Sequence, residues 1–249
     1  MDPLTISAAS GLRSRMEALD VLANNLANAE TSGYKTDHEF YGLYTSAEAY
    51  DPSGSGFVST LPVIEKQWTD FSQGTLASTG NPLDVALSGP GFIALNGPTG
   101  SLYTRNGNLK VSSTGDLVTR DGYAVRSAGT NGNPIHITSD KPIDISPDGT
   151  VRQGDQTLGQ LEIVNFKSTD SLKKLTGAAF QNTDPANVPV PAADTKIEQG
   201  KVEAANVAVP EAAMRLVGVM RQFEMLQKAV TLNSQMDQSG IQEVARVTQ

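Results

Sequence analysis

Two segments at opposite ends of this 249-residue chain carry apolar residues at heptad spacing, which constrains the fold more than any other feature. The N-terminal series alternates steps of four and three residues: Leu12, Met16, Leu19, Ala23 and Leu26. This spacing predicts an amphipathic helix within residues 1–35. Gly33 suits a left-handed helix C-cap, and Lys35 would lie beside the negative end of the helix dipole.

Three asparagines, Asn24, Asn25 and Asn28, lie in the same predicted helix. Asparagine is a weak helix former. Two interpretations stay open: the amides bond to the backbone of a neighbouring chain, or they form a polar helix face.

The C-terminal segment, residues 205–249, carries two apolar stripes. The first consists of Leu216, Val219, Phe223, Leu226 and Val230, and the second of Met225, Ala229, Leu232 and Met236. A helix that packed only against the other terminus would need one stripe, so two stripes predict more than one neighbour. Pro210 suits the first helical turn. We expect the helix to reach about Ser239 and to be interrupted at Gly240, which costs about 1 kcal/mol relative to Ala in a helix interior; the last residues then either resume the helix or fray.

The middle of the chain has strand and turn character. Asn106-Gly107, Asp121-Gly122 and Asp148-Gly149 are strong hairpin signals because both residues of each pair tolerate positive φ. We therefore predict an α+β fold in which paired, coiled-coil-like terminal helices carry a central all-β domain of short antiparallel strands. The expected parts are an N-terminal helix, an extended linker, a β domain, a return linker and a C-terminal helix, at 1–35, 36–80, 81–181, 182–204 and 205–249.

The expected linker at 36–80 contains several aromatic residues. Phe40, Tyr41 and Tyr44 cluster near its start, and 51–56 reads as a turn or flexible tip. Trp68 and Phe71 follow in a polar setting. Either these aromatic side chains dock on another part of the protein, or they form a small satellite core.

Composition excludes several classes of protein. The formal net charge is −8 and the basic residues are scattered, so nucleic acid is not an expected partner. The absence of cysteine excludes disulfides and thiolate metal sites. No apolar run reaches the length of a membrane span, so we expect no membrane insertion, and residues 1–7 lack the features of a cleavable signal peptide.

No catalytic motif emerges, so we expect neither an enzyme nor a cofactor or metal site. The only histidines, His38 and His136, are far apart in the sequence. Asp84 and Glu203 have no neighbouring partner for acid–base chemistry and are interpreted as structural residues.

Four blocks of sequence carry a family resemblance. Residues 23–35, 79–92, 103–119 and 199–207 are similar, in the same order, to the signatures of the rod and hook axial proteins of the bacterial flagellum. The resemblance spans nearly the whole chain and is most like a basal-body rod protein. The segment Arg221-Gln222-Phe223-Glu224-Met225 resembles the corresponding sequence of proximal rod proteins. A distal rod protein and a hook protein are the alternatives.

The resemblance implies a structural subunit that polymerises through its terminal helices into the axial drive shaft around the export channel. It implies homo- and hetero-assembly with other rod and hook proteins. It also implies contact with the flagellar type III export apparatus, and a periplasmic location reached without a cleaved signal. The remote alternative is an extracellular β-domain enzyme or carbohydrate binder, for which Tyr41, Tyr44 and Trp68 are the candidate site residues.

Overall fold

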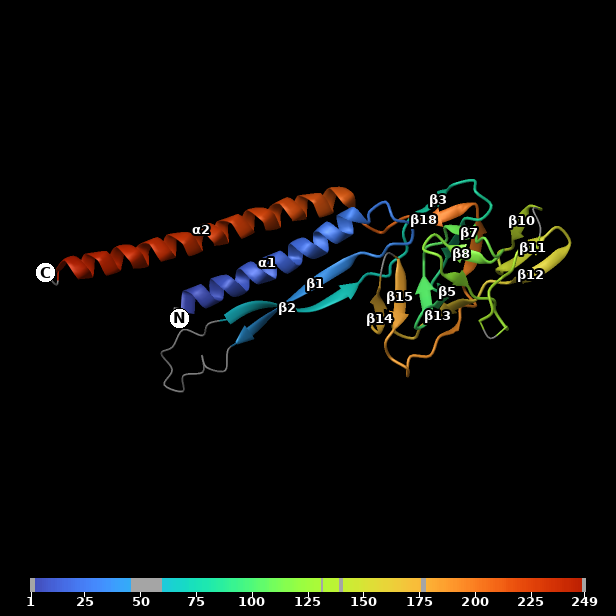
Figure 1. Cartoon of the computed structure of the whole chain (residues 1–249), viewed down its shortest axis with the longest axis horizontal. Helices are drawn as coiled ribbons and strands as arrows, with labels where there is room; N and C mark the ends of the chain where they lie inside the picture. The colour runs from blue at the N-terminus through green and yellow to red at the C-terminus, as the bar shows by residue number, and fades with distance from the viewer. Residues whose placement is uncertain (1–2, 46–59, 131, 139–140, 176–177, 248–249) are drawn as a thin grey trace. The chain divides into compact units, whose positions relative to one another are not determined.

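The computed structural model describes residues 3–45, 60–130, 132–138, 141–175 and 178–247 (Figure 1). The chain forms two compact units, each made of segments distant in sequence. Unit 1 gathers the described parts of Met1–Ala27, Asp37–Trp68 and Ala208–Gln249, and unit 2 gathers Asn28–Thr36 and Thr69–Val207. The predicted α+β class, with one helix near each end and antiparallel strands between, is confirmed.

Unit 1 consists of two long helices and a two-stranded sheet. Its elements are α1 (Pro3–Ala27), α2 (Val209–Val247), β1 (Asp37–Thr45) and β2 (Thr60–Thr69). The helices lie side by side and run in opposite directions, and β1 contacts α1 (Figure 1). Among the described residues, no helix is both long and apolar enough to cross a membrane.

Both helices end at places that differ from those predicted. Helix α1 ends at Ala27, six residues before Gly33. Helix α2 begins at Val209, with Pro210 and Glu211 in the first turn, where proline and an acidic side chain are favourable. It continues through Gly240 to Val247, so the predicted interruption is wrong. A penalty of about 1 kcal/mol for one glycine does not end a helix of this length.

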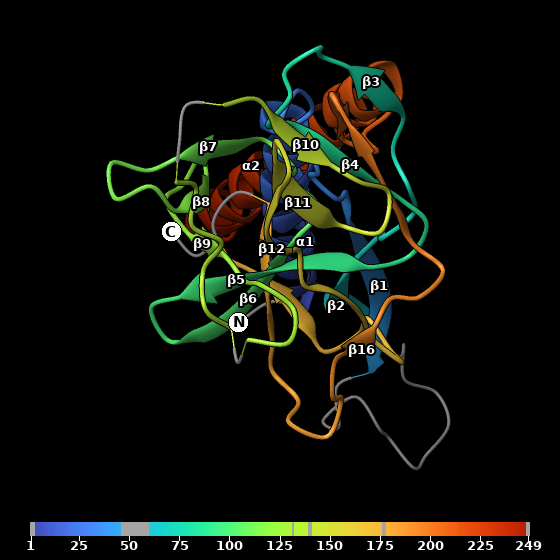
Figure 2. The same ribbon diagram turned by 90° about the vertical axis from the view of Figure 1, so that its right-hand side faces the viewer.

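Unit 2 is built from short antiparallel strands (Figures 1 and 2). Its largest sheet contains, along one path, β14 (Leu172–Lys174), β15 (Ala179–Asn182), β6 (Gly100–Thr104), β5 (Phe92–Gly97), β9 (Ala124–Val125), β8 (Leu117–Thr119) and β7 (Leu109–Val111). Two more strands join this sheet: β13 (Ile163–Asn165) pairs with β5, and β16 (Val190–Pro191) pairs with β13.

Three smaller sheets complete the described part of unit 2. One contains β10 (Ile143–Ile145), β11 (Thr150–Gln153) and β12 (Gln156–Gln160). The other two pair β4 (Val85–Ser88) with β17 (Lys196–Gln199) and β3 (Leu76–Ser78) with β18 (Lys201–Glu203). The last two pairings join strands more than 100 residues apart in the sequence.

Two of the three predicted hairpin turns are confirmed. Gly122 (φ 91°) lies in the turn between β8 and β9, and Gly149 (φ 88°) in the turn between β10 and β11. The prediction at Asn106-Gly107 is wrong: β6 and β7 do not pair with each other, and the φ of Gly107 lies outside the left-handed region. Glycine is needed there for space, because a Cβ would lie 1.6 Å from the carbonyl oxygen of Val85.

The core of unit 2 has an aliphatic and an aromatic cluster. The aliphatic cluster lies around Leu87, Ile93 and Leu117. The aromatic cluster contains Phe92, Tyr103, Phe166 and Phe180. Phe71 packs on it, with its ring centroid 5.5 Å from Phe92 and 5.1 Å from Phe180. One aromatic of the expected linker therefore docks on the β body.

The structure contains strands where linkers were expected. Residues 36–80 include β1, β2 and β3, and residues 182–204 include β16, β17 and β18. β1 and β2 pair with each other, whereas β3, β17 and β18 pair with strands more than 100 residues away, so local composition gives no sign of those pairings. The turn expected at 51–56 and the side chains of Phe40, Tyr41, Leu43 and Tyr44 lie outside what the structure describes.

Candidate functional site

Helix α2 presents two apolar stripes with different surroundings in unit 1. The first stripe is partly covered along its length: Leu216, Val219, Phe223, Leu226 and Val230. The second is exposed, with Met225 61%, Leu232 59% and Met236 72% exposed. Ala229 is exposed as well, and Met214, 70% exposed, extends the row toward the start of the helix. The two stripes lie roughly 140° apart around an ideal helix axis.

Helix α1 buries a different face from the one that its large apolar residues mark. Met16 is 54% exposed and Ala23 is exposed, whereas Leu12, Leu19 and Leu26 are partly covered. Most of the buried positions are small or polar, although Val21 and Leu22 are apolar: Gly11, Ser14, Ala18, Val21, Leu22 and Asn25. The Leu12–Leu26 series is therefore not the most buried face of α1 within the single chain, and its assignment to a subunit interface stays a prediction.

Small residues on the buried face allow α1 to lie close to α2. A Cβ added to Gly11 would lie 3.6 Å from Leu226 Cδ1, an ordinary van der Waals distance, so Gly11 faces α2 and leaves room there for no more than a small side chain. Ala18 is completely buried and Ser14 is 4% exposed. Glycine, serine and alanine carry little hydropathy, which is why the sequence pattern did not reveal this face.

The three asparagines of the N-terminal motif have different environments. Asn25 is 2% exposed. Its Nδ2 donates to the carbonyl of Asp37 at 2.7 Å, and its Oδ1 accepts from the Asp37 N–H at 3.0 Å. This amide therefore bonds within its own chain, where it holds the start of β1. Asn24 is exposed, and Asn28 Oδ1 accepts a bond from Thr31 Oγ1 in unit 2.

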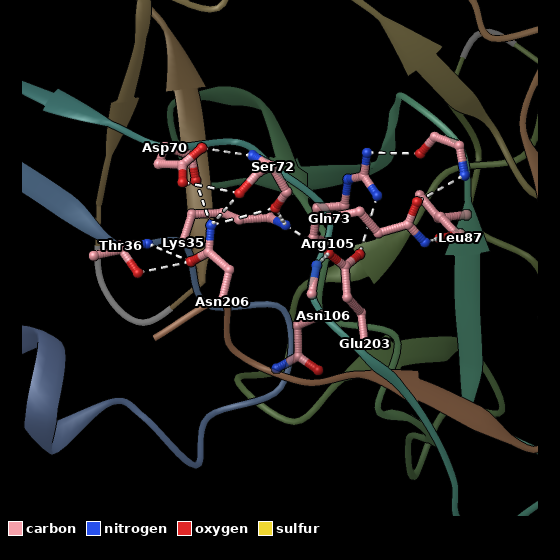
Figure 3. A network of polar contacts seen from close by, with 12 residues as sticks. Lys35, Thr36, Asp70, Ser72, Gln73, Leu87, Arg105, Asn106, Glu203 and Asn206 are labelled. Carbon is pink, nitrogen blue, oxygen red and sulfur yellow. Dashed lines mark hydrogen bonds and ion pairs between the residues drawn. The ribbon is translucent and has the colours of Figure 1, made fainter. Parts of the chain in front are cut away.

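Glu203 is the centre of a buried ion cluster in unit 2 (Figure 3). Its Oε1 accepts hydrogen bonds from Lys35 Nζ at 2.5 Å and from the Gly74 N–H at 2.8 Å. Its Oε2 accepts from Arg105 Nη1 at 3.0 Å. The side chains of Lys35 and Glu203 are completely buried, and that of Arg105 is 4% exposed. One carboxylate therefore serves two buried cations.

Backbone carbonyls and an aromatic ring complete the environment of the two cations. Lys35 Nζ also donates to the carbonyl of Ser72 at 2.6 Å, and Arg105 Nη2 donates to that of Gly89 at 2.8 Å. The Arg105 guanidinium lies 5.6 Å from the ring centroid of Phe92, within the range of a cation–π interaction. Its Nε is buried without a hydrogen-bond partner among the described residues.

The ionisation of Lys35 reflects two opposing effects. Burial lowers the pKa of Lys35 below its ordinary value of 10.5, because removal from water disfavours the charged ammonium. The hydrogen bond and the charge of Glu203 act in the opposite direction, and burial is the larger effect. The ion pair thus offsets only part of the cost of burying the lysine.

Asn206 links the same segments through neutral hydrogen bonds (Figure 3). Its Oδ1 accepts from both the N–H and the Oγ1 of Thr36 at 2.8 Å. Its Nδ2 donates to the carbonyls of Asp70 at 2.8 Å and Ser72 at 3.3 Å. Together with the Glu203 cluster, this amide ties four chain segments into one polar network: 35–36, 70–74, Arg105 and 203–206.

The polar network lies where the chain leaves unit 2. The chain passes from one unit to the other at four points in the sequence, between residues 27 and 28, 36 and 37, 68 and 69, and 207 and 208. Thr36, Asp70 and Asn206 each lie within two residues of one of these passages. Inside unit 2, the network therefore holds together the segments that continue into the helices and the β1–β2 sheet.

Gly33 fits against this network where no larger residue could. It adopts φ 69°, the left-handed conformation that was expected, although it does not cap α1. Its N–H donates to the carbonyl of Glu203 at 2.7 Å. A Cβ would lie 2.3 Å from the backbone nitrogen of Asn106, so this position requires glycine on steric grounds as well.

Sequence reasoning missed the ion cluster. Lys35 was assigned to the helix dipole and Glu203 to an isolated structural role, and Arg105 was not singled out. The available signal was that all three lie inside blocks used for the family resemblance, 23–35, 103–119 and 199–207. Glu203 is 98 residues from Arg105 and 168 residues from Lys35 in the sequence, and no periodicity can reveal contacts at such separations.

The residues considered for chemistry have ordinary structural surroundings. His38 stacks on Trp68 at 4.8 Å, and His136 Nδ1 lies 3.0 Å from Asp116 Oδ1. Asp84 Oδ1 accepts a bond from Asn81 Nδ2. Within the described ranges, no group of three or more His, Cys, Asp or Glu side chains could hold a metal ion. Of the aromatic trio, only the side chain of Trp68 is described, and it is 48% exposed.

Three family models match the chain in the order of its parts. The model of the flagella basal body rod protein matches residues 7–35, that of the flagellar hook protein FlgE/F/G D1 domain matches 86–153, and that of the flagellar basal body rod FlgEFG protein C-terminal matches 198–243. The first falls on α1 and the turn to Lys35, the second on the β body, and the third on β18 and α2. These matches define the class: an axial protein of the bacterial flagellum.

Similar full-length proteins narrow the class. The chain is 33% identical to the flagellar basal-body rod protein FlgG of Agrobacterium fabrum, over 92% of this chain and 94% of the relative. It is 32% identical to the rod protein FlgF of Mesorhizobium japonicum, over 89% and 88%. FlgF of Caulobacter vibrioides is 29% identical over 92% of both chains. The chain belongs to the family of flagellar basal-body rod proteins of the FlgF/FlgG type.

Proposed function

We propose that this chain builds the flagellar rod by packing the exposed stripe of α2 against neighbouring subunits. Its role as a structural subunit of the basal-body rod follows from its family. The observation that carries the proposal is the contrast between the two stripes of α2. The stripe of Leu216, Phe223 and Leu226 is partly covered within the chain, whereas that of Met225, Leu232 and Met236 is exposed.

The exposed stripe is too apolar to be an ordinary solvent face. Met214, Met225, Leu232 and Met236 are each more than half exposed and follow one line along the helix. Full burial of a Leu or Met side chain contributes roughly 1.5–3 kcal/mol. A row of such exposed apolar residues along one helix marks an interaction site. In the rod, the natural occupants of this row are further copies of the chain and the other axial proteins.

The terminal helices form the assembly core in this proposal. Helices α1 and α2 pair as a coiled-coil-like unit, and the outer faces of that unit, including the partly covered Leu12, Leu19 and Leu26 and the exposed Met16, meet neighbouring subunits. The rod so formed surrounds the export channel and transmits torque. The chain reaches the periplasmic rod through the flagellar type III export apparatus without cleavage.

We also propose where along the flagellar axis this chain lies. The short segment between Lys35 and Thr79 and the small β body favour the proximal rod over the distal rod and the hook. Relatives named FlgF and FlgG match at comparable identity, so the identities do not discriminate between the two. Labelling the chain in isolated basal bodies and locating it along the axis tests this choice.

The experiment for the assembly surface compares two substitutions in neighbouring turns of α2. Leu232→Asp places a charge in the exposed stripe, whereas Gln235→Asp places the same charge on the exposed polar face. Because an unpaired carboxylate buried at an interface costs several kcal/mol, we expect the first to abolish rods and swimming and the second to preserve them. Both purified chains should keep the helical content of the parent, since Leu232 is exposed in the single chain. Normal swimming of the Leu232→Asp strain would contradict the proposal.

A further inference from the structure

Methionine in this protein is concentrated on exposed surfaces of the helices. The chain has six methionines, and the side chains of five are described. All five are between 47% and 72% exposed: Met16, Met214, Met220, Met225 and Met236. The two hydrophobic clusters of unit 2 contain no methionine among the described residues. Methionine here fills a surface and not the core.

Three of these methionines repeat at intervals of eleven residues. Met214, Met225 and Met236 are each separated by three turns of an ideal helix, so they lie on one face and successive side chains are about 16.5 Å apart. Among the described methionines, they are also the three most exposed, at 70%, 61% and 72%. We refer to these three residues as the methionine row. It lies along the exposed stripe of α2.

The methionine row is chemically open to a two-electron oxidant. A hydroperoxide transfers one oxygen atom to the thioether sulfur; the sulfur is oxidised to the sulfoxide, the O–O bond breaks, and the peroxide is reduced to water or an alcohol. The product is a polar side chain in place of an apolar one. The chain has no cysteine that would compete for the oxidant.

We propose that the methionine row is an oxidation site that controls polymerisation of the free subunit. The inference rests on the proposed function, because it needs the exposed stripe of α2 to be an assembly surface. Sulfoxides at Met214, Met225 and Met236 place three polar S=O groups on this surface, and an interface formed on them must bury these groups without partners. Oxidation therefore blocks assembly, and assembly shields the sulfurs from oxidation. Methionine sulfoxide reductases restore the competent subunit.

The test uses the purified full-length chain and hydrogen peroxide. Polymerisation is measured by sedimentation before and after peroxide treatment, and the oxidised sites are identified by peptide mass spectrometry. Burying one unsatisfied polar group weakens an association by roughly tenfold or more. We therefore expect the critical concentration to rise at least about tenfold after oxidation of the row, and to return after treatment with MsrA and MsrB.

Two variants separate the methionine row from other effects of peroxide. Met214→Leu/Met225→Leu/Met236→Leu keeps the stripe apolar and of similar volume but removes its oxidisable sulfurs. Its critical concentration should rise much less with peroxide than that of the parent, because of the assembly-surface methionines only Met16, which is 54% exposed on α1, remains oxidisable. Met16→Leu, which removes the exposed methionine of α1 and leaves the row intact, should remain as sensitive as the parent chain.

The outcomes separate this inference from the function on which it rests. If the untreated parent polymerises and the oxidised parent polymerises at the same critical concentration, the oxidation switch is wrong and the assembly surface stands. Peroxide sensitivity in the triple variant as large as that of the parent also overturns the switch. If the untreated chain does not polymerise with itself under any concentration tested, the proposed self-assembly fails, and the switch fails with it.

Discussion

Lys35 Nζ lies 2.5 Å from Glu203 Oε1, although the two residues are separated by 168 positions in the sequence and both side chains are completely buried. The pair joins the end of the N-terminal segment of unit 2 to its last strand, β18. Arg105, from the segment that follows β6, shares the same carboxylate. This geometry makes Glu203 the residue on which the packing of three separate segments depends.

Loss of the Glu203 charge should destabilise the protein strongly. Glu203→Gln leaves Lys35 and Arg105 buried without a counter-charge, and breaking a buried pair in this way costs about 3–5 kcal/mol. The matched control is Glu198→Gln, which breaks the partly exposed pair with Lys201 and should cost no more than about 1 kcal/mol. Urea unfolding of the two full-length variants gives both free energies. An equal, small loss in the two chains would show that the cluster does not hold the segments together.

The lowered pKa of Lys35 predicts how the stability of the cluster changes with pH. Because burial lowers the pKa of Lys35 in the folded state, the unfolded chain binds its proton more tightly. Folding therefore gains stability from this residue as pH rises from the lowered folded pKa toward the ordinary value of 10.5, and the gain is absent below that window. The difference in unfolding free energy between the parent and Lys35→Met should grow in favour of the parent from neutral pH to pH 10.5. A difference that falls as pH rises would contradict the sign.

Gly107 and Gly122 should respond very differently to alanine. At Gly107 a Cβ would lie 1.6 Å from a backbone oxygen that cannot move alone, so Gly107→Ala should cost about 3 kcal/mol or more, or prevent folding. At Gly122 a Cβ meets no atom within 4 Å, so only the left-handed φ opposes alanine, at about 1–2 kcal/mol. Thermal unfolding of both variants measures the contrast. Equal melting temperatures would mean that Gly107 is not sterically required.

The parts of the fold that the sequence predicted are those set by local rules. The periodic residues Leu216 to Met236 gave α2 and its two stripes, because helical spacing is visible within a few turns. The Asp-Gly pairs at 121–122 and 148–149 gave two hairpins, because a tight turn depends on two neighbouring residues. Asn106-Gly107 failed because a glycine can be required by a distant strand as well as by a turn.

Long-range pairing accounts for most of what the sequence could not show. Residues 196–199 pair with β4 and 201–203 with β3, whose positions in the chain are more than 100 residues earlier. Read alone, these short polar stretches resemble a linker. The buried face of α1 was missed for a different reason: Gly11, Ser14 and Ala18 are small, so their burial leaves little trace in hydropathy.

Of the two parts of the candidate site, the sequence revealed one and not the other. The exposed stripe of α2 was visible in the sequence as a second apolar series without an obvious partner within the chain. The Glu203 cluster was not visible, since a lone Lys, Arg and Glu in three distant blocks cannot be paired without the fold. In both cases the tertiary structure decided which residues are covered and which are left for a partner.

Amide hydrogen exchange on the free chain and on assembled rods tests the central claim most directly. In a dilute, monodisperse sample, α2 should exchange faster than the buried strand β5, because helix stability in proteins comes mainly from packing and one apolar stripe of α2 is uncovered. In assembled rods, exchange along 214–236 should slow by roughly tenfold or more, while β5 changes little. If α2 in the free chain is already as protected as β5, or if assembly leaves its exchange unchanged, the exposed stripe of α2 is not the surface through which the rod is built.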